Sequence, residues 1–393
     1  MIRVAFPLFG HGLWIGGLVY LQNTLRLVRE RLAGELEAVL VLSADEYKRF
    51  GAEVSPLANE TIVDDVFGSW GRGGGLVSTL LLGRDRHVHA LLKRARVDVG
   101  LEDASFYGWQ PGIGVLAWIP DFQHRFMPEM FSRQEWWHRD IGFRAQVASG
   151  RTIMVSSETA RADCERFYPA ARGRIRVVRF AAGIDPSVPR TPPASLREKY
   201  GLPERFIFLP NQFWRHKNHE LVIDALLHLR AEGRLESVMP IVASGHAADP
   251  RHPGHFEALA RKVADGNLSS HFQHLGTIPY SDVLGLVVAC DHLINPSHFE
   301  GWSTTIEEAK ALGARILLSD LPVHREQAPE AMFFSPRSNI ECAEALLAAA
   351  ARGPAERPSP TALAAAHEQR LEDHADAFLD AVRATRIPVL SRK

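Results

Sequence analysis

Apolar residues in the first half of the chain alternate between short runs and longer periodic stretches. Residues 2–6 form a short apolar run, which is typical of a buried strand. The next apolar positions recur every three or four residues and predict an amphipathic helix; they are Leu18, Leu21, Leu25, Val28 and Leu32. Further strands are predicted over 37–42, 115–119 and 152–155. Strands that alternate with helices predict an α/β fold with parallel sheets.

The same alternation restarts after the proline-rich segment 187–194, which has few apolar residues and is interpreted as a linker. The strands predicted beyond it cover 206–209, 238–243, 292–295 and 316–319. Two successive arrays predict two doubly wound domains with a cleft between them, over residues 1–190 and 191–365. The Ala- and charge-rich tail, 361–389, predicts a mainly helical segment.

Composition narrows the class of protein. A chain of 393 residues exceeds one ordinary core, and 46% hydrophobic with 23% charged residues is typical of a soluble globular protein. The net charge of -1 provides no global field for nucleic acid, so no nucleic-acid partner is predicted. The three cysteines are scattered and odd in number, which argues against a disulfide framework. No apolar run approaches the about 20 residues of a membrane span, and the chain starts with a strand pattern rather than a signal peptide. We therefore expect a cytoplasmic protein.

The segment 295–320 carries the most chemical information. It lies between two apolar runs, 291–294 and 315–318, that are interpreted as strands. Thr304-x-x-Glu307 fits a capping box that opens a short helix, and Gly313 would close that helix. A helix start provides unpaired N–H groups and partial positive charge, which suit a phosphate.

Two carboxylates in this segment, Glu300 and Glu308, are candidates for ligand binding. Glu307 and Glu308 project about 100° apart on a helix, so both cannot face one ligand. We interpret Glu307 as the cap and Glu308 as the residue that faces the helix mouth together with Glu300. For Glu308 alone, a simpler interpretation stays open, in which an acidic residue near a helix start complements the helix dipole.

The Glu-x7-Glu spacing, with Gly301 after the first Glu and Ser297 before it, resembles the signature of family 4 glycosyltransferases. These are retaining, sugar-nucleotide-dependent enzymes of the GT-B architecture. The resemblance extends from about residue 10 to about residue 330. It implies two Rossmann-like domains and a C-terminal helix, residues 366–393, that crosses back to the first domain. It also implies that Glu308 holds the ribose hydroxyls of the nucleotide and that Glu300 contacts the donor sugar near the reacting carbon.

The resemblance implies a diphosphate site as well. Gly16 and Gly17 start the first helix, where glycine lets backbone N–H groups approach an anion. The stretch lacks the Gly-x-Gly-x-x-Gly spacing of a nicotinamide dehydrogenase. Lys217 matches the lysine that similar enzymes direct at the leaving diphosphate. The usual arginine lies five residues earlier, where this chain has Gln212, so Arg215 is a candidate second cation. An ordinary pair of solvated basic residues is the alternative.

Two further positions belong to this donor site. The stretch 271–279, with Thr277 and Ile278, resembles the turn whose backbone holds the nucleotide base. Ser303 and Thr304, at the start of the helix that follows Glu300, complete the candidate nucleotide-binding residues.

On the acceptor side, Asp121 and His124 follow the strand predicted over 115–119. The carboxyl ends of strands are where open α/β sheets bind ligands. Similar enzymes often have Asp and His in this loop. His124 is a candidate for hydrogen bonding a sugar hydroxyl or for deprotonating an acceptor, because imidazole titrates near neutral pH. Asp121 is a second candidate, with fixing the loop after Pro120 as its alternative role.

Metal and membrane signals are weaker. The histidine pairs 216/219, 252/255 and 271/274 lack a complete ligand set, so we expect no metal and no cofactor beyond the donor substrate. The stretch 83–98 carries Arg84, Arg86, Lys93, Arg94 and Arg96. It is interpreted either as a solvated helix face or as a patch that associates peripherally with a membrane.

Together these features favour a retaining glycosyltransferase. It would move a hexose from a nucleotide diphosphate sugar to a saccharide or lipid-linked saccharide acceptor, in cell-surface polysaccharide or glycoconjugate synthesis. Two alternatives stay open: a non-catalytic sugar-nucleotide-binding protein on the same fold, suggested by Gln212, and a GT-B-fold sugar-nucleotide epimerase.

Overall fold

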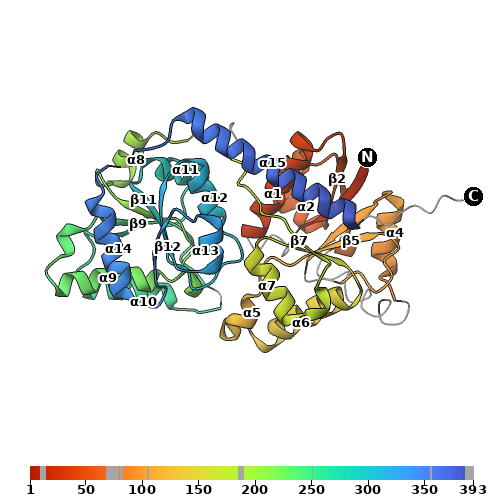
Figure 1. The fold of residues 1–393 in the computed structure, drawn as a ribbon, viewed down its shortest axis with the longest axis horizontal. Helices are drawn as coiled ribbons and strands as arrows, with labels where there is room; N and C mark the ends of the chain where they lie inside the picture. The colour runs from red at the N-terminus through yellow and green to blue at the C-terminus, as the bar shows by residue number, and fades with distance from the viewer. Residues whose placement is uncertain are drawn as a thin grey trace, which may run out of the picture. The chain divides into compact units, whose positions relative to one another are not determined.

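Two parallel sheets organise the chain, each in its own unit of the computed structural model (Figure 1). The structure describes residues 1–8, 15–67, 79, 83–103, 106–184, 190–249, 251–354 and 356–385. Unit 1 consists of Met1–Gly183 with Glu368–Lys393, and unit 2 of Ile184–His367. The boundaries expected from the sequence were 190 and 365.

The sheet of unit 1 has the strand order β3-β2-β1-β4-β5-β6-β7, and its neighbouring strands are parallel. Its strands are β1 Ile2–Pro7, β2 Leu36–Leu42, β3 Glu60–Val63, β4 Val99–Glu102, β5 Gly114–Trp118, β6 Thr152–Val155 and β7 Ile175–Val177. Its helices are α1 Ile15–Arg31, α2 Ala44–Val54, α4 Arg86–Arg94, α5 Gln123–Phe126, α6 Arg133–Ala148 and α7 Glu158–Phe167.

The sheet of unit 2 has the order β10-β9-β8-β11-β12-β13, again with parallel neighbours. Its strands are β8 Ile207–Leu209, β9 Ile241–Ala243, β10 Phe272–His274, β11 His292–Asn295, β12 Arg315–Ser319 and β13 Met332–Phe334. Its helices are α8 Pro193–Tyr200, α9 His219–Ala231, α10 His255–Asp265, α11 Tyr280–Ala289, α12 Thr304–Ala311, α13 Pro322–Gln327 and α14 Asn339–Ala351.

Strand β8 of unit 2 and the residue before it divide their side chains between two helical layers. Ile207 and Leu209 of β8 pack in one buried cluster with residues of α9, α10 and α14. Phe206 and Phe208 pack in another, with residues of α8, α11 and α12. Successive side chains of a strand point to opposite faces, so a continuous apolar run is what a sheet covered on both sides requires. The prediction of two Rossmann-like, doubly wound α/β domains is confirmed.

Several predicted elements needed new limits. The strand expected over 238–243 starts only at Ile241, because Pro240 has no N–H to give to a sheet. The segment interpreted as a linker ends in α8, which begins at Pro193, a position where proline suits a first helical turn. Residues 187–189 of that segment lie outside the described residues.

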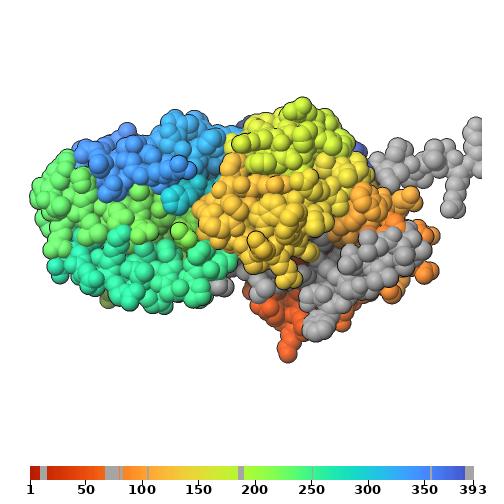
Figure 2. All heavy atoms as spheres, turned by 90° about the horizontal axis from the view of Figure 1, so that it is seen from below, coloured from red at the N-terminus to blue at the C-terminus, as the bar shows by residue number. Residues whose placement is uncertain are grey.

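The last described helix, α15 (Pro360–Thr385), connects the two units along the chain. Its residues from Glu368 onward belong to unit 1, where Arg31 pairs with Glu368 and the ring of Phe378 stacks on Phe6 at 6.2 Å. α9 and α10 lie at the surface of unit 2, and α5 and α6 lie at the surface of unit 1 (Figure 2).

Candidate active site

The strand order of the unit 2 sheet reverses between β8 and β11. From this point β9 and β10 extend to one side, and β12 and β13 extend to the other. Open α/β sheets bind their ligands outside the carboxyl ends of the strands at such a switch point. The loop after β8 leads to Lys217, and the loop after β11 leads to Glu300. These two loops therefore enclose the position where a ligand of this sheet is expected.

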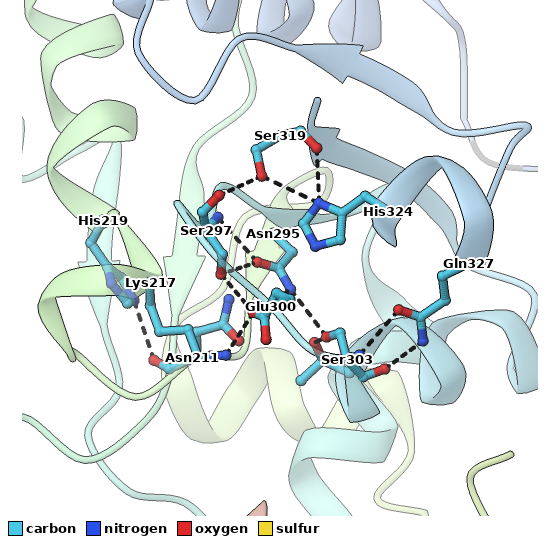
Figure 3. Close-up of polar contacts among 11 residues, drawn as sticks. Asn211, Lys217, His219, Asn295, Ser297, Glu300, Ser303, Ser319, His324 and Gln327 are labelled. Atoms are coloured by element: carbon cyan, nitrogen blue, oxygen red, sulfur yellow. Dashed lines mark hydrogen bonds and ion pairs between the residues drawn. The ribbon is translucent and has the colours of Figure 1, made fainter. Parts of the chain in front are cut away.

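Lys217 and Glu300 are in direct contact at this point, although 83 residues separate them in the chain (Figure 3). The Lys217 ammonium donates to Glu300 Oε1 at 2.7 Å. Both side chains are largely buried, with 17% of Lys217 and 9% of Glu300 exposed. An ammonium has three donors, and one is used here, so two stay available for an anionic ligand.

Glu300 is held as a charged group. Its Oε1 also accepts from the Ser297 hydroxyl at 2.7 Å and, more weakly, from the Asn295 amide at 3.5 Å. Burial by itself would raise the pKa of Glu300, but the positive charge of Lys217 outweighs it and lowers the pKa to about 2. Oε2 accepts no hydrogen bond from a described residue. One carboxylate oxygen is therefore fixed by the protein, and the other is free to meet a ligand.

A second layer of hydrogen bonds fixes the loop that carries Glu300. The Ser297 backbone N–H donates to Asn295 Oδ1 at 3.2 Å, and the Ser297 carbonyl accepts from the Ser319 hydroxyl at 2.6 Å (Figure 3). His324 Nδ1 contacts the Ser319 carbonyl at 2.8 Å. Because a carbonyl only accepts, this contact assigns the ring proton to Nδ1. The ends of β11 and β12 are thus joined directly behind the carboxylate.

The start of α12 differs from the prediction. The N-cap is Ser303, one residue earlier than expected, and its side chain makes no capping bond. The prediction that Glu307 caps this helix is wrong. The Glu307 carboxylate instead accepts from Lys310 at 3.0 Å and from Gln327 at 2.9 Å. Gln327 of α13 also accepts from Ser303 N at 3.1 Å and donates to Ser303 O at 2.8 Å. A side chain from another helix therefore fixes this helix start. The predicted end at Gly313 is confirmed by its φ of 69°.

Glu308 faces away from Glu307, as the helical geometry requires, and lies in a different environment from Glu300. It is 5% exposed, and its Oε1 accepts from the Tyr280 hydroxyl at 2.7 Å. Burial raises the pKa of Glu308 to about 7, with Tyr280 acting in the opposite direction. Oε2 of Glu308 accepts no hydrogen bond from the described residues. No contact joins Glu308 to Lys217 or Glu300 within the described part of the chain.

The other residues of unit 2 that the sequence suggests for binding the nucleotide sugar differ in how exposed their side chains are. Gln212 is half-buried in the loop after β8, and Arg215 is exposed at the start of the short 3-10 helix Arg215–Lys217. Thr277 is exposed after β10, whereas Ile278 packs partly on the core. Thr304 is half-buried as the first residue of α12.

In unit 1, Gly16 and Gly17 occupy the first turn of α1. Residues 9–14, which precede this helix, lie outside the described residues. Backbone N–H groups of a first helical turn have no partner within the helix, so the position remains chemically suited to an anion.

His124 is sealed inside unit 1. The residue is 0% exposed, and its Nε2 lies 3.4 Å from the Tyr168 hydroxyl, which itself donates to Asp140 at 2.7 Å. Burial, together with the nearby charge of Arg139, lowers the pKa of His124 to about 4. The expectation that this imidazole titrates near neutral pH is therefore wrong. Asp121 accepts from Gln123 N at 2.9 Å, the contact expected of a residue that fixes the loop.

The structure also bears on the candidate metal sites and on the candidate membrane-binding patch. Among the described residues, no group of three or more His, Cys, Asp or Glu side chains has the arrangement of a metal site. None of the described helices has both the length and the hydrophobicity needed to cross a membrane. The basic residues of 83–98 are all exposed; they are Arg84, Arg86, Lys93, Arg94 and Arg96.

Sequence reasoning missed Asn295, Gln327 and Tyr280. Asn295 ends β11, so its place at the carboxyl end of a strand was an available signal. Tyr280 and Gln327 act on α12 from 28 and 24 residues away in the chain, respectively. No local spacing indicates such contacts.

Comparisons with known proteins found similar sequences and similar folds. Residues 194–365 match the family model described as "Glycosyl transferases group 1". The chain is 22% identical over 221 residues to the O-antigen chain mannosyltransferase B of Escherichia coli, a match that covers 56% of this chain and 56% of that relative's length. A glycosyltransferase structure from Rickettsia africae aligns with a TM-score of 0.64 at 14% identity, covering 98% of this chain and 93% of the other. HepE of Anabaena, in complex with UDP and glucose, aligns with a TM-score of 0.60 at 15% identity, covering 98% and 97%. At these identities the structural likeness concerns the fold, which is the GT-B architecture.

Proposed function

Residues 194–365 belong to the group 1 glycosyl transferases, and from this premise we propose that the protein is a retaining glycosyltransferase. It moves a hexose from a nucleoside diphosphate sugar to a saccharide or lipid-linked saccharide acceptor in polysaccharide or glycoconjugate synthesis. The observation that carries the proposal is the contact of Lys217 with Glu300 at the switch point of unit 2. A cation and a carboxylate held together there suit a substrate that carries a diphosphate and a sugar.

Lys217 acts on the leaving group. As the bond between the anomeric carbon and the diphosphate oxygen breaks, negative charge develops on the diphosphate. A cation already fixed in a site with little water stabilises this charge without reorganising. Glu300 uses one of the three ammonium donors and thereby aims the other two. Arg215, which is exposed on the same short helix, supplies the second cation in place of the arginine that Gln212 replaces.

Glu300 acts on the sugar. Its pKa of about 2 keeps it ionised at any working pH, so Oε2 serves as a hydrogen-bond acceptor for donor hydroxyls. Its negative charge also favours the positive charge that develops at the anomeric carbon. The acceptor oxygen bonds to that carbon, and its proton passes to the departing phosphate oxygen, so the atoms balance without an enzyme nucleophile. Glu308 takes the ribose hydroxyls, Thr277 and Ile278 hold the base through their backbone, and Ser303 and Thr304 border the phosphates. The first turn of α1 in unit 1, with Gly16 and Gly17, is a separate candidate for binding an anion.

On the acceptor side we propose that Asp121 and His124 shape the site rather than move protons. A neutral imidazole in a sealed position is a poor general base at neutral pH. The exposed basic residues of 83–98 suit an anionic membrane that carries a lipid-linked acceptor. Cosedimentation with vesicles containing phosphatidylglycerol, absent with neutral vesicles, is the expected result for that surface.

Product analysis tests the main proposal. The full-length protein is first screened by thermal shift with UDP, GDP and ADP, since a bound nucleotide raises the melting temperature. The hexose donors of the stabilising nucleotide are then supplied without acceptor. GDP-mannose is included first, because the relative from Escherichia coli is named a mannosyltransferase. Slow release of the nucleoside diphosphate supports transfer chemistry. A binder leaves the donor intact, and an epimerase returns an isomerised donor.

The stereochemistry decides the remaining point. With an acceptor present, NMR of the product should show the same anomeric configuration as the donor. An inverted product would overturn the retaining mechanism while leaving the family assignment of residues 194–365 intact.

A further inference from the structure

Tyr280 occupies a position that connects two parts of the proposed nucleotide site. It is the first residue of α11 and directly follows the turn of Thr277 and Ile278. Its hydroxyl donates to Glu308 Oε1 at 2.7 Å, across 28 residues of chain. The proposed base-holding turn and the proposed ribose-holding carboxylate are thus joined through one side chain.

The two members of this pair differ in exposure. Glu308 is 5% exposed, whereas Tyr280 is 44% exposed. A carboxylate oxygen has room for two hydrogen bonds, so the tyrosine uses one place on Oε1 and leaves the other, with both places on Oε2. Without the tyrosine hydroxyl, Oε1 would have no donor among the described residues, and nothing would select one orientation of the carboxylate.

We propose that Tyr280 is a positioning residue of the nucleotide site, which orients Glu308 toward the ribose hydroxyls and so couples nucleotide affinity to its own hydroxyl group. This inference rests on the proposed function, because it assumes that Glu308 meets the ribose of a nucleoside diphosphate.

The pair also predicts a pH dependence. Burial raises the pKa of Glu308 to about 7, and the hydrogen bond from Tyr280 opposes this effect. The other ionisable groups on α12 and the elements near it are engaged elsewhere; they are Glu307 with Lys310, Asp282 with Lys199 and Tyr200, Lys217 with Glu300, and His324 with Ser319. None of them contributes to the shift of the Glu308 pKa. Ribose hydroxyls are better donors to a carboxylate than to a carboxylic acid, so nucleotide affinity should rise as the pH passes about 7.

The test compares the full-length wild type with Tyr280→Phe. The dissociation constants of UDP, GDP and ADP are measured by calorimetry between pH 5.5 and 9, and the nucleotide that the wild type binds best is followed. At pH 7, Tyr280→Phe should bind about three- to tenfold more weakly, the usual effect of one hydrogen bond. The midpoint of the affinity rise should move upward, because the hydrogen bond that lowers the pKa of Glu308 is lost. Part of the loss of affinity should persist at pH 9, where the carboxylate is ionised but no longer oriented.

Tyr200→Phe is the matched control. It also removes a tyrosine hydroxyl that donates to a buried carboxylate of unit 2, that of Asp282 at 2.5 Å. It should change neither the nucleotide affinity nor the midpoint of its rise with pH. A carbon-13 NMR titration of the Glu308 carboxyl, assigned with Glu308→Gln, should show the same upward movement for Tyr280→Phe in the absence of nucleotide.

The outcomes separate this inference from the proposed function. An affinity equal to that of the wild type at every pH, or a midpoint that does not move, overturns the role of Tyr280 while nucleotide binding stands. A 2′-deoxynucleoside diphosphate should bind the wild type more weakly than its ribose counterpart, and Tyr280→Phe should reduce that difference. A wild type that binds none of the three nucleotides overturns the proposed function, and this inference with it.

Discussion

Glu300 and Glu308 lie eight residues apart, and both are largely buried, yet their environments shift their acidity in opposite directions. Glu300 has a cation at 2.7 Å, and its pKa falls to about 2. Among the described residues, the hydrogen-bond partner of Glu308 is a neutral hydroxyl at 2.7 Å, and burial raises its pKa to about 7. The comparison teaches that the charge of the nearest partner, rather than the depth of burial, decides whether a buried carboxylate stays ionised. A permanent charge suits a reacting centre, whereas a group near its pKa suits reversible binding.

The largest effect is expected when the cation is removed from Glu300. Lys217→Met leaves a buried carboxylate without its partner, which should cost roughly 3–5 kcal/mol of the free energy of unfolding and abolish turnover. Urea denaturation at pH 7 measures this loss. Lys199→Met is the control, because Lys199 also pairs with a carboxylate at 2.7 Å but its side chain is 51% exposed.

The double variant Lys217→Met, Glu300→Gln keeps this prediction informative if the single variant folds poorly. It should recover most of the stability, because no charge is left buried, and none of the activity. A single variant as stable as the wild type would mean that the contact between Lys217 and Glu300 has no energetic role.

The next effect concerns turnover. Glu300→Gln keeps the size and most hydrogen bonds of the side chain but removes its charge, so the rate of transfer should fall by roughly 10²–10³. The dissociation constant of the free nucleoside diphosphate should change little, because the proposed contact with the ribose is made by Glu308. Steady-state kinetics beside calorimetry separates the two quantities. A normal turnover number would remove Glu300 from the reacting centre.

Glu308→Gln should affect nucleotide affinity more than turnover, the reverse of Glu300→Gln. Nucleotide binding should weaken by about 1.5–3 kcal/mol, and the rate of the saturated enzyme should change less. It should also change how the free energy of unfolding depends on pH. A carboxyl whose pKa rises from 4.5 to about 7 on folding stabilises the protein only while it is protonated, so wild-type stability falls as the pH rises through 7.

The glutamine variant lacks this loss. Relative to the wild type, the free energy of unfolding of the variant should increase by on the order of 1–3 kcal/mol between pH 5 and pH 8. Melting temperatures over that range provide the check. A wild type and a variant that melt in parallel at every pH would contradict the raised pKa of Glu308.

The smallest effect should come from unit 1. His124 has a pKa of about 4, so it stays neutral between pH 5.5 and pH 8. His124→Asn should lower the rate without changing the shape of its pH profile over this range. An inflection near pH 6.5 that disappears in the variant would show that the imidazole takes part in proton transfer and opens to the substrate.

The local sequence pattern predicted the strand–helix–strand segment that carries Glu300 and Glu308. The strands β11 and β12, the helix between them and its end at Gly313 followed from apolar runs and one glycine. The start of α12 did not follow. The capping box is a local rule, and here Gln327 of α13 fixes Ser303, so the helix begins one residue earlier and Glu307 turns to Lys310.

His124 shows the same limit in unit 1. Its place after an apolar strand was readable, but its acidity was not. It lies on α5 and is buried by Phe143 and Trp136 of α6, which pack against its ring, and by Tyr168, whose hydroxyl lies 3.4 Å from its Nε2. The titration of an imidazole depends on solvent access and on neighbouring charges, and neither is a property of local spacing.

The sequence by itself determined the two α/β arrays and the chemical types placed after each strand of unit 2. Periodicity and turn residues act over a few positions, so they are written in the chain directly. Only the tertiary structure decided which partners the carboxylates have. Parallel strands bring residues separated by 83 and by 28 positions within 2.7 Å, as in Lys217 with Glu300 and Tyr280 with Glu308. Coulombic attraction and desolvation act through space, so the charge state of the site emerges only once the sheet has assembled.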